Sequence, residues 1–350
     1  MRQVGVVPLR MIARQPIIRI RGHVRDEMHM QTAIVAEGGG QRGIYTAGVL
    51  DAFLRADFNP FTHGVGVSAG AQNLLAYFLG QTGYARWAIA ELTSAPDFFV
   101  PYRWFGSRSV VDLDGYFERA MNDPDNRLPF QRYGDLVADR DLSFVATDRD
   151  TLQAVYLEPD ASTALDWMKA SSAVPFLYRS GVVHEGRCLV DGGVSDPLPV
   201  RHAYEKGARR MLVVRTAGVG VGSHVSHGWR QRLERVGRAR ALPQTVRRML
   251  GCYEAAIADA EQFLANPPTD LELVQVRPRS ALCSQLFGSR SESLVADYRI
   301  GMADGKRMVA TLDSWVSEVP RPVPHKPSVQ DATEPRSRSA TDQRRERRSA

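Results

Sequence analysis

Two glycine-rich turns decide the fold of this 350-residue chain: Glu37-Gly38-Gly39-Gly40-Gln41-Arg42-Gly43 and Gly66-Val67-Ser68-Ala69-Gly70. Each turn follows a short apolar run, at 32–36 and 64–67, and each precedes a helical pattern, at 44–54 and 71–79. A strand, a tight turn and a helix, repeated in this order, predict an α/β protein with a mainly parallel sheet.

The rest of the chain continues this alternation. Further strands are predicted at 142–147, 154–157, 188–190, 211–215 and 271–276, and further helices at 164–171, 200–206, 253–264 and 294–315. We therefore expect one α/β domain whose sheet is covered on both faces, with helical additions after about residue 217.

Composition narrows the class of protein. The chain is 43% hydrophobic and 24% charged, which is typical of globular proteins and excludes a fully disordered or low-complexity chain. Its three cysteines, Cys188, Cys252 and Cys283, predict neither a disulfide framework nor a zinc site, and they suit a reducing compartment. Because no apolar run approaches about 18 residues, we expect a cytoplasmic protein without a membrane span.

The two ends of the chain differ from its centre. Residues 1–31 are expected to form a loose, arginine-rich leader; a transit peptide is disfavoured because Pro8 and Pro16 would break its helix. Residues 318–350 contain eight Lys/Arg, five Asp/Glu and many prolines, so we expect a disordered basic tail. This tail is either solubilising or a tether to an anionic surface or nucleic acid.

The first glycine turn has three interpretations. Its G-x-G-x-x-G pattern, formed by Gly38, Gly40 and Gly43, occurs in dinucleotide sites, in oxyanion holes and in plain tight turns. A dinucleotide site needs an acidic residue at the end of the next strand, but that strand ends in Val67-Ser68-Ala69. The sequence therefore favours an oxyanion hole made of exposed backbone N–H groups.

The second turn predicts a nucleophile. Gly66 and Gly70 flank Ser68 in a G-x-S-x-G pattern between a strand and a helix, which is typical of a sharp turn that exposes a serine hydroxyl. Ser68 would also lie at a helix N-terminus, where negative charge on an attacked carbonyl oxygen is favoured. Either pattern alone occurs by chance, whereas the two in succession support each other.

A nucleophilic serine needs a base, and an aspartate is better placed than any histidine. His202, His224, His227 and His325 follow the motifs, but none stands at a recognisable strand end. Asp191 follows the strand at 188–190, and Gly192 and Gly193 clear space around its carboxylate. Because parallel strands end at one edge of a sheet, we expect Asp191 to reach Ser68.

These motifs, in this order, resemble the patatin-like phospholipase family. The segments Ala146-Thr147-Asp148 and Ala170-Ser171-Ser172-Ala173-Val174-Pro175 resemble two further parts of that family, and the resemblance covers about residues 32–216. It implies a three-layer α/β/α catalytic domain over 32–216. Residues 217–317 are similar to the mostly helical C-terminal extension of a bacterial subgroup whose first motif reads Glu-Gly-Gly-Gly-Gln-Arg-Gly.

The resemblance implies hydrolysis of lipid acyl esters by a Ser–Asp dyad, without calcium or another cofactor. Ser68 would be the nucleophile and Asp191 the proton acceptor. The oxyanion hole would be formed by backbone N–H groups of Gly38, Gly39, Gly40 and Ala69. Two alternatives stay open, namely an acyltransferase that uses the same acyl-enzyme and a non-catalytic lipid-binding or regulatory protein. Arg42 would hold a lipid head group or brace the loop by pairing with Glu37 or another acid.

An arginine-rich segment near residues 229–250 bears on the partners of the protein. Seven arginines and one acid lie between Trp229 and Leu250, and Trp229, Leu233 and Val236 recur at helical spacing. This pattern predicts a basic amphipathic helix that either lies on an anionic membrane or packs on the domain. Nucleic acid is an unlikely partner because no stacking aromatics accompany the arginines. The sequence leaves the oligomeric state and the identity of the lipid open.

Overall fold

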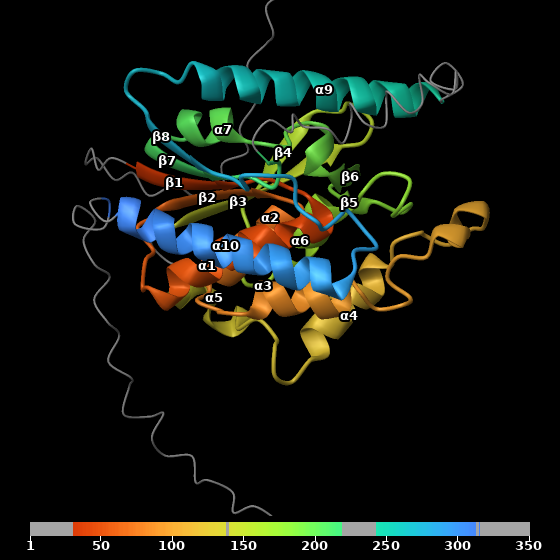
Figure 1. The fold of residues 1–350 in the computed structure, drawn as a ribbon. Helices are drawn as coiled ribbons and strands as arrows, with labels where there is room; N and C mark the ends of the chain where they lie inside the picture. The colour runs from red at the N-terminus through yellow and green to blue at the C-terminus, as the bar shows by residue number, and fades with distance from the viewer. Residues whose placement is uncertain (1–30, 138–139, 219–242, 313–314, 316–350) are drawn as a thin grey trace, which may run out of the picture.

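The computed structural model describes residues 31–137, 140–218, 243–312 and 315 (Figure 1). Its centre is an eight-stranded sheet in the order β5-β6-β3-β2-β1-β7-β8, with β4 paired to β3. The strands are β1 Gln31–Ala36, β2 His63–Val67, β3 Asp141–Asp148, β4 Ala154–Leu157, β5 Val182–His184, β6 Arg187–Asp191, β7 Ala208–Val214 and β8 Glu272–Val276. Four of the pairings are parallel, so the predicted mainly parallel sheet is confirmed.

Helices cover both faces of this sheet and make three layers. On one face lie α7 (Val200–Glu205) and α9 (Gln244–Ala265), at the top of Figure 1. On the other face lie α1 (Gly43–Arg55), α2 (Ala69–Phe78), α3 (Tyr84–Trp87), α4 (Leu113–Asn122), α5 (Tyr133–Val137), α6 (Ala164–Ser172) and α10 (Ser291–Thr311). The short helices are η1 (Gly40–Arg42), the π-helix η2 (Ala88–Leu92), η3 (Pro101–Phe105), η4 (Phe130–Arg132) and η5 (Gly192–Val194).

The strand residues alternate between two hydrophobic cores. Ile34 and Leu212 belong to the core shared with α1, α2 and α6, whereas Val35 and Val213 belong to the core beneath α7 and α9. Successive side chains on a strand point to opposite faces, so a run of continuous apolar residues fills both cores at once. This explains why the central strands carry few polar residues.

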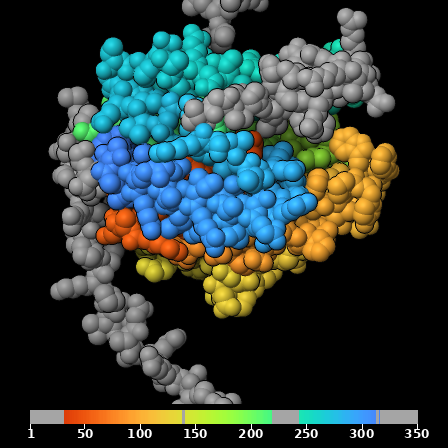
Figure 2. All heavy atoms as spheres, viewed as in Figure 1, coloured from red at the N-terminus to blue at the C-terminus, as the bar shows by residue number. Residues whose placement is uncertain are grey.

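Helices α1 and α10 pack at very short range. A Cβ atom added to Gly301 would lie 2.1 Å from the Tyr45 carbonyl oxygen, so only glycine allows the observed approach. Reciprocal hydrogen bonds join the helices at either end of the contact: Tyr45 donates to Asp304 at 2.7 Å, and Tyr298 donates to Asp51 at 2.7 Å. The last long helix is therefore part of the body of the molecule (Figure 2).

The structure also departs from the sequence predictions. Strand β8 coincides with the strand predicted at 271–276 and pairs with β7, so the sheet extends beyond residues 32–216 into the segment expected to be mostly helical. Helix α9 begins at Gln244 rather than at 253, and strand β5 and the helices between 84 and 137 were not predicted. Residues 1–30 of the leader, residues 229–242 of the predicted basic helix and the tail at 318–350 lie outside the described residues, whereas residues 244–250 of that predicted helix form the start of α9. Within the described part, no helix is both long enough and apolar enough to cross a bilayer.

Candidate active site

Ser68 stands on a strained turn between β2 and α2. Its backbone has φ 54° and ψ −124°, a conformation that residues other than glycine rarely adopt. The Ser68 N–H donates to Ser171 Oγ at 2.8 Å, and Ser171 Oγ donates to the Val145 carbonyl oxygen at 2.6 Å. The turn is also crowded, since a Cβ atom on Gly70 would lie 2.4 Å from the Ala36 oxygen. Contacts with α6 and with strands β1 and β3 thus keep Ser68 in this strained conformation.

The strand register brings Asp191 beside Ser68. Strand β4 occupies one edge of β3, so β2 and β6 share the other edge, β2 along 141–145 and β6 along 146–148. Val67 is opposite Val145 and Asp191 is opposite Ala146, which places the end of β6 where β2 gives way to the Ser68 turn. The two strands therefore deliver the serine and the aspartate to one point.

The Asp191 carboxylate is buried and nearly enclosed. Burial raises its pKa from 3.8 to about 6, against the opposing effects of hydrogen bonds from the Gly193 N–H and the Ser68 side chain. The Gly193 bond is 2.7 Å long, and the Thr147 hydroxyl donates to the Asp191 carbonyl oxygen at 2.8 Å. A Cβ atom on Gly192 would lie 2.1 Å from the Val145 oxygen, so this turn also depends on a glycine. The carboxylate is a stronger base than a solvated one.

No histidine takes the role of base in the described part of the chain. His63 is buried at the start of β2, His184 packs edge-on against Trp167, and the His202 ring stacks on Tyr156 at 3.5 Å. None of the three is hydrogen-bonded to Ser68 or Asp191 among the described residues. The described part also contains no cluster of three or more His, Cys, Asp or Glu side chains that could hold a metal ion.

The first glycine turn lies against the second. A Cβ atom on Gly38 would lie 3.2 Å from the Val67 oxygen and 3.5 Å from Ser68 Cβ, so the two turns are in contact. In the described part, the N–H groups of Gly38, Gly39 and Gly40 have no hydrogen-bond acceptor, and Ala69 begins helix α2 with its N–H equally free. Unpaired N–H groups next to a serine hydroxyl are suited to bind an oxyanion.

Distant segments fix the conformation of this glycine turn. Glu37 accepts hydrogen bonds from the Thr216 N–H at 2.6 Å and the Ala217 N–H at 3.2 Å, and the Thr216 hydroxyl donates to the Gly38 oxygen at 3.0 Å. On the other side the Gln41 N–H donates to the Leu286 oxygen at 3.0 Å. Gly40 has φ 54°, and a Cβ atom on it would lie 2.3 Å from that same oxygen. Both ends of the turn are thereby held by residues after β7.

Arg42 contacts its own loop. Its Nε donates to the Gly39 carbonyl oxygen at 3.4 Å, a long hydrogen bond. The expected pairing with Glu37 is not formed, because Glu37 binds Thr216, Ala217 and, at 3.9 Å, Arg215. The role of Arg42 toward a head group stays a prediction.

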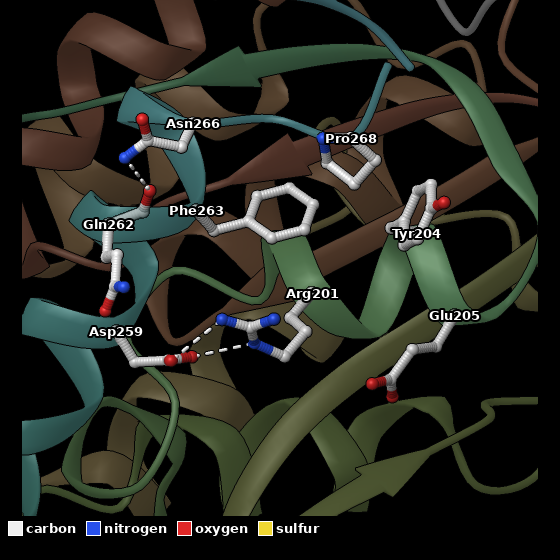
Figure 3. A pocket seen from close by; sticks show the side chains of 8 residues that line it. All are labelled: Arg201, Tyr204, Glu205, Asp259, Gln262, Phe263, Asn266 and Pro268. Carbon is white, nitrogen blue, oxygen red and sulfur yellow. Dashed lines mark hydrogen bonds and ion pairs between the residues drawn. The ribbon is translucent and has the colours of Figure 1, made fainter. Parts of the chain in front are cut away.

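One hollow in the described part of the structure lies beside this site, and another lies away from it. The small one adjoins Ser68 and is mostly apolar, lined by Ala69, Gln72, Asn73, Tyr84, Ala85, Ala88 and Ile89. The larger one, of about 450 Å³, lies between α7 and α9 (Figure 3). There Arg201 forms two 2.8 Å bonds with Asp259, so its charge is already compensated. None of the motif residues lines this second hollow.

Several residues of the site were not assigned roles from the sequence. Ser171 lies 103 positions from the Ser68 amide that it binds, and Thr216 lies 179 positions from Glu37. The only signal for Ser171 was its place in the segment from Ala170 to Pro175. The structure places Ser68, Asp191 and the first glycine turn next to one another, and their catalytic roles stay predictions.

Comparisons with known proteins agree with this architecture. Residues 34–204 match the family described as patatin-like phospholipase, and residues 243–317 match a domain of unknown function, DUF6363. The chain belongs to the patatin-like phospholipase family and has its α/β fold.

Among individual relatives, an uncharacterized protein of Escherichia coli (strain K12), YjjU, is 39% identical over 82% of this chain and 79% of its own. Two similar solved structures are VipD from Legionella pneumophila and a human GIVD cytosolic phospholipase A2 bound to methyl γ-linolenyl fluorophosphonate. VipD has a TM-score of 0.41 and 14% identity, over 81% of this chain and 67% of VipD. The human structure has a TM-score of 0.44 and 13% identity, over 85% of this chain and 61% of the human chain.

Proposed function

We propose that the protein is a serine hydrolase that cleaves acyl esters of lipids through Ser68 and Asp191. One observation carries the proposal: the strand register brings a serine in a strained backbone conformation beside a buried carboxylate, whose pKa burial raises to about 6 against the opposing effect of the Ser68 side chain. Backbone strain and a buried carboxylate both reduce stability, and such features cluster at functional sites. Family membership supports a lipid ester as the substrate class.

The proposed reaction has two steps. Ser68 Oγ attacks the ester carbonyl carbon while Asp191 accepts its proton, and the carbonyl oxygen becomes an oxyanion bound by backbone N–H groups of the glycine turn and Ala69. The C–O bond to the alcohol then breaks, Asp191 returns the proton to the departing alcohol, and an acyl-Ser68 ester remains. Water attacks this ester with Asp191 as base, which releases the fatty acid and restores Ser68.

Turnover of p-nitrophenyl esters of graded chain length tests the proposal. We expect the wild type to hydrolyse them and Ser68→Ala and Asp191→Asn to lose at least about 10³-fold in kcat/KM. Repeating the assay with added glycerol, and measuring acylglycerol, would separate hydrolysis from acyl transfer. Activity retained by Ser68→Ala would contradict the assignment of the nucleophile.

A further inference from the structure

One hairpin, residues 99–111, exposes an unusual group of aromatic side chains. Tyr102 is 74% exposed, Trp104 51% and Phe105 92%, all on the five-residue helix η3. These are three of the six large hydrophobic side chains that are exposed in the described part of the chain. The hairpin projects from the body beyond α4, in orange in Figures 1 and 2. Exposed apolar groups gathered in this way mark interaction surfaces.

The base of the hairpin is well ordered by hydrogen bonds. The Val100 N–H donates to the Val110 oxygen at 2.8 Å, and the Asp112 N–H donates to the Phe98 oxygen at 2.8 Å. Arg179 Nη2 donates to the Trp104 carbonyl oxygen at 2.8 Å and so ties the tip to the loop after α6. The aromatic side chains are therefore presented by a fixed backbone.

The charge around the aromatic residues is positive. Residues 98–111 contain Arg103 and Arg108 and no acid, and the exposed Arg179 lies against the tip. Of the two flanking acids, Asp97 pairs with Arg119 and Asp112 caps α4, and Arg103 donates to the Asp97 carbonyl oxygen. Arg108 is exposed and forms no ion pair with any acid among the described residues. Aromatic rings with a polar edge together with arginines suit the boundary between lipid head groups and acyl chains.

The hairpin also adjoins both halves of the candidate active site. The Phe99 ring stacks on Phe287 at 5.2 Å, next to Leu286, whose carbonyl oxygen holds the glycine turn. The Val111 N–H donates to the Leu177 oxygen at 3.0 Å, and that loop begins at Ala173, whose oxygen accepts the Asp191 N–H at 3.0 Å. The base of the hairpin is thus joined to the segments that hold the glycine turn and Asp191.

We propose that this hairpin is an anchor for a phospholipid surface. Tyr102, Trp104 and Phe105 enter the head-group region, and the exposed Arg108 and Arg179 face the lipid phosphates. The choice of a lipid surface as the partner rests on the proposed function, but binding itself requires no turnover. The anchor is separate from the arginine-rich segment 229–248 that the sequence indicated.

Sedimentation with phospholipid vesicles tests the anchor. The full chain carrying Ser68→Ala is used as the parent, so that no lipid is consumed and the result does not depend on catalysis. The vesicles are phosphatidylcholine alone, or phosphatidylcholine mixed with phosphatidylglycerol. Thermal unfolding and gel filtration of each variant report folding and oligomeric state.

We expect Trp104→Ser with Phe105→Ser to weaken binding to both vesicles by about tenfold or more, because apolar burial is lost. Arg108→Gln should weaken binding to the phosphatidylglycerol vesicles alone. Ile300→Ser, which removes another exposed apolar side chain (41%) on α10, should change neither.

Three results would overturn the anchor. One is a parent that binds neither vesicle; another is a folded aromatic double variant that binds as tightly as the parent. The third is a double variant that instead changes the oligomeric state, which would make the hairpin a contact with a second copy. If vesicle binding behaves as expected while wild-type Ser68 shows no ester turnover, the proposed function fails and the anchor stands.

Discussion

At the scale of single residues, the site combines two features that reduce stability. Ser68 is held in a rare backbone conformation, and Asp191 is removed from water with few compensating hydrogen bonds. Both are retained because surrounding residues fix them, including Ser171 behind the serine and Gly193 beside the carboxylate. A reactive serine next to a base of raised pKa is the expected chemical consequence.

The raised pKa of Asp191 predicts the pH dependence of the reaction. The base must be ionised, so kcat/KM for a soluble ester should fall about tenfold per pH unit below a pKa of about 6 and level off above it. The profile is measured from pH 4.5 to 8.5, over the range where the protein stays folded. Activity that remains constant down to pH 4.5 would show that Asp191 is not perturbed or is not the base.

Ser171 is predicted to act as a positioning residue. Ser171→Ala removes the acceptor of the Ser68 N–H, which leaves a buried donor unpaired and should cost about 1–3 kcal/mol of unfolding free energy. A displaced Ser68 should also lower kcat by about 10- to 100-fold. Urea unfolding and ester turnover measure the two effects.

Ser172→Ala is the matched control for this variant. Ser172 accepts a hydrogen bond from Gln72 Nε2 at 2.9 Å, one position along the same helix, and does not bind the Ser68 backbone. Loss of this hydrogen bond should lower the free energy of unfolding by less than about 1 kcal/mol. Equal effects of the two substitutions on kcat would contradict the role given to Ser171.

The dyad could be predicted from the sequence because each member lies in a short local motif. Ser68 and Asp191 are flanked by glycines at strand ends. They meet through the register of β2 and β6 along β3 and not, as expected, at the shared carboxyl edge of parallel strands, because β6 runs antiparallel to β3. The contacts of Glu37 with Thr216 and of Gln41 with Leu286 join segments far apart in the chain, so no local pattern announces them. Likewise, the sequence did not show that β6 runs antiparallel to β3.

At the scale of elements, the strongly apolar strands were predicted and the irregular ones were not. β1, β2, β3, β4, β6, β7 and β8 coincide with predicted strands, whereas β5 has three residues and is partly exposed. Between 84 and 137 most helical segments have three to five residues, which is too brief to show helical periodicity. Helix α4 has ten residues with apolar residues at helical spacing, and this pattern was missed. The positions of these segments are set by packing onto α2 and the sheet.

The packing of α10 on α1 predicts a large effect of one methyl group. Gly301→Ala would place Cβ 2.1 Å from the Tyr45 oxygen, so the helices must separate. We expect the free energy of unfolding to fall by about 1–3 kcal/mol. Gly251→Ala on α9 is the control, because no atom lies within 4 Å of the added Cβ. It should be neutral or stabilising by up to about 1 kcal/mol.

Chemical unfolding of both variants distinguishes packing from helix propensity. If Gly301→Ala were as stable as Gly251→Ala, the close contact between α1 and α10 would not exist in the molecule. A loss in Gly301→Ala alone would confirm it.

At the scale of the whole molecule, the segment after residue 243 completes the body. Strand β8 extends the sheet, α9 covers one of its faces, and α10 packs on α1 against the other. The same segment provides Leu286, which holds the glycine turn. The C-terminal family match at 243–317 therefore describes a part of one folded unit.

Truncation is expected to show this dependence. A chain that ends at residue 218 would expose the cores under α9 and α10 and should be insoluble or unfold without cooperativity. A chain that ends at residue 317 keeps all the described elements and should unfold as the full chain does. Cooperative unfolding of the shorter chain, at a stability close to that of the full chain, would contradict the account.

The most direct test of the central claim is covalent labelling of the intact protein with a fluorophosphonate. We expect that one equivalent adds to the wild type, that the modified peptide contains Ser68, and that Ser68→Ala takes up none. Asp191→Asn should be labelled much more slowly, because the proton acceptor is lost. Labelling that persists in Ser68→Ala, or a folded wild type that takes up no label, would contradict the claim that Ser68 is an activated nucleophile.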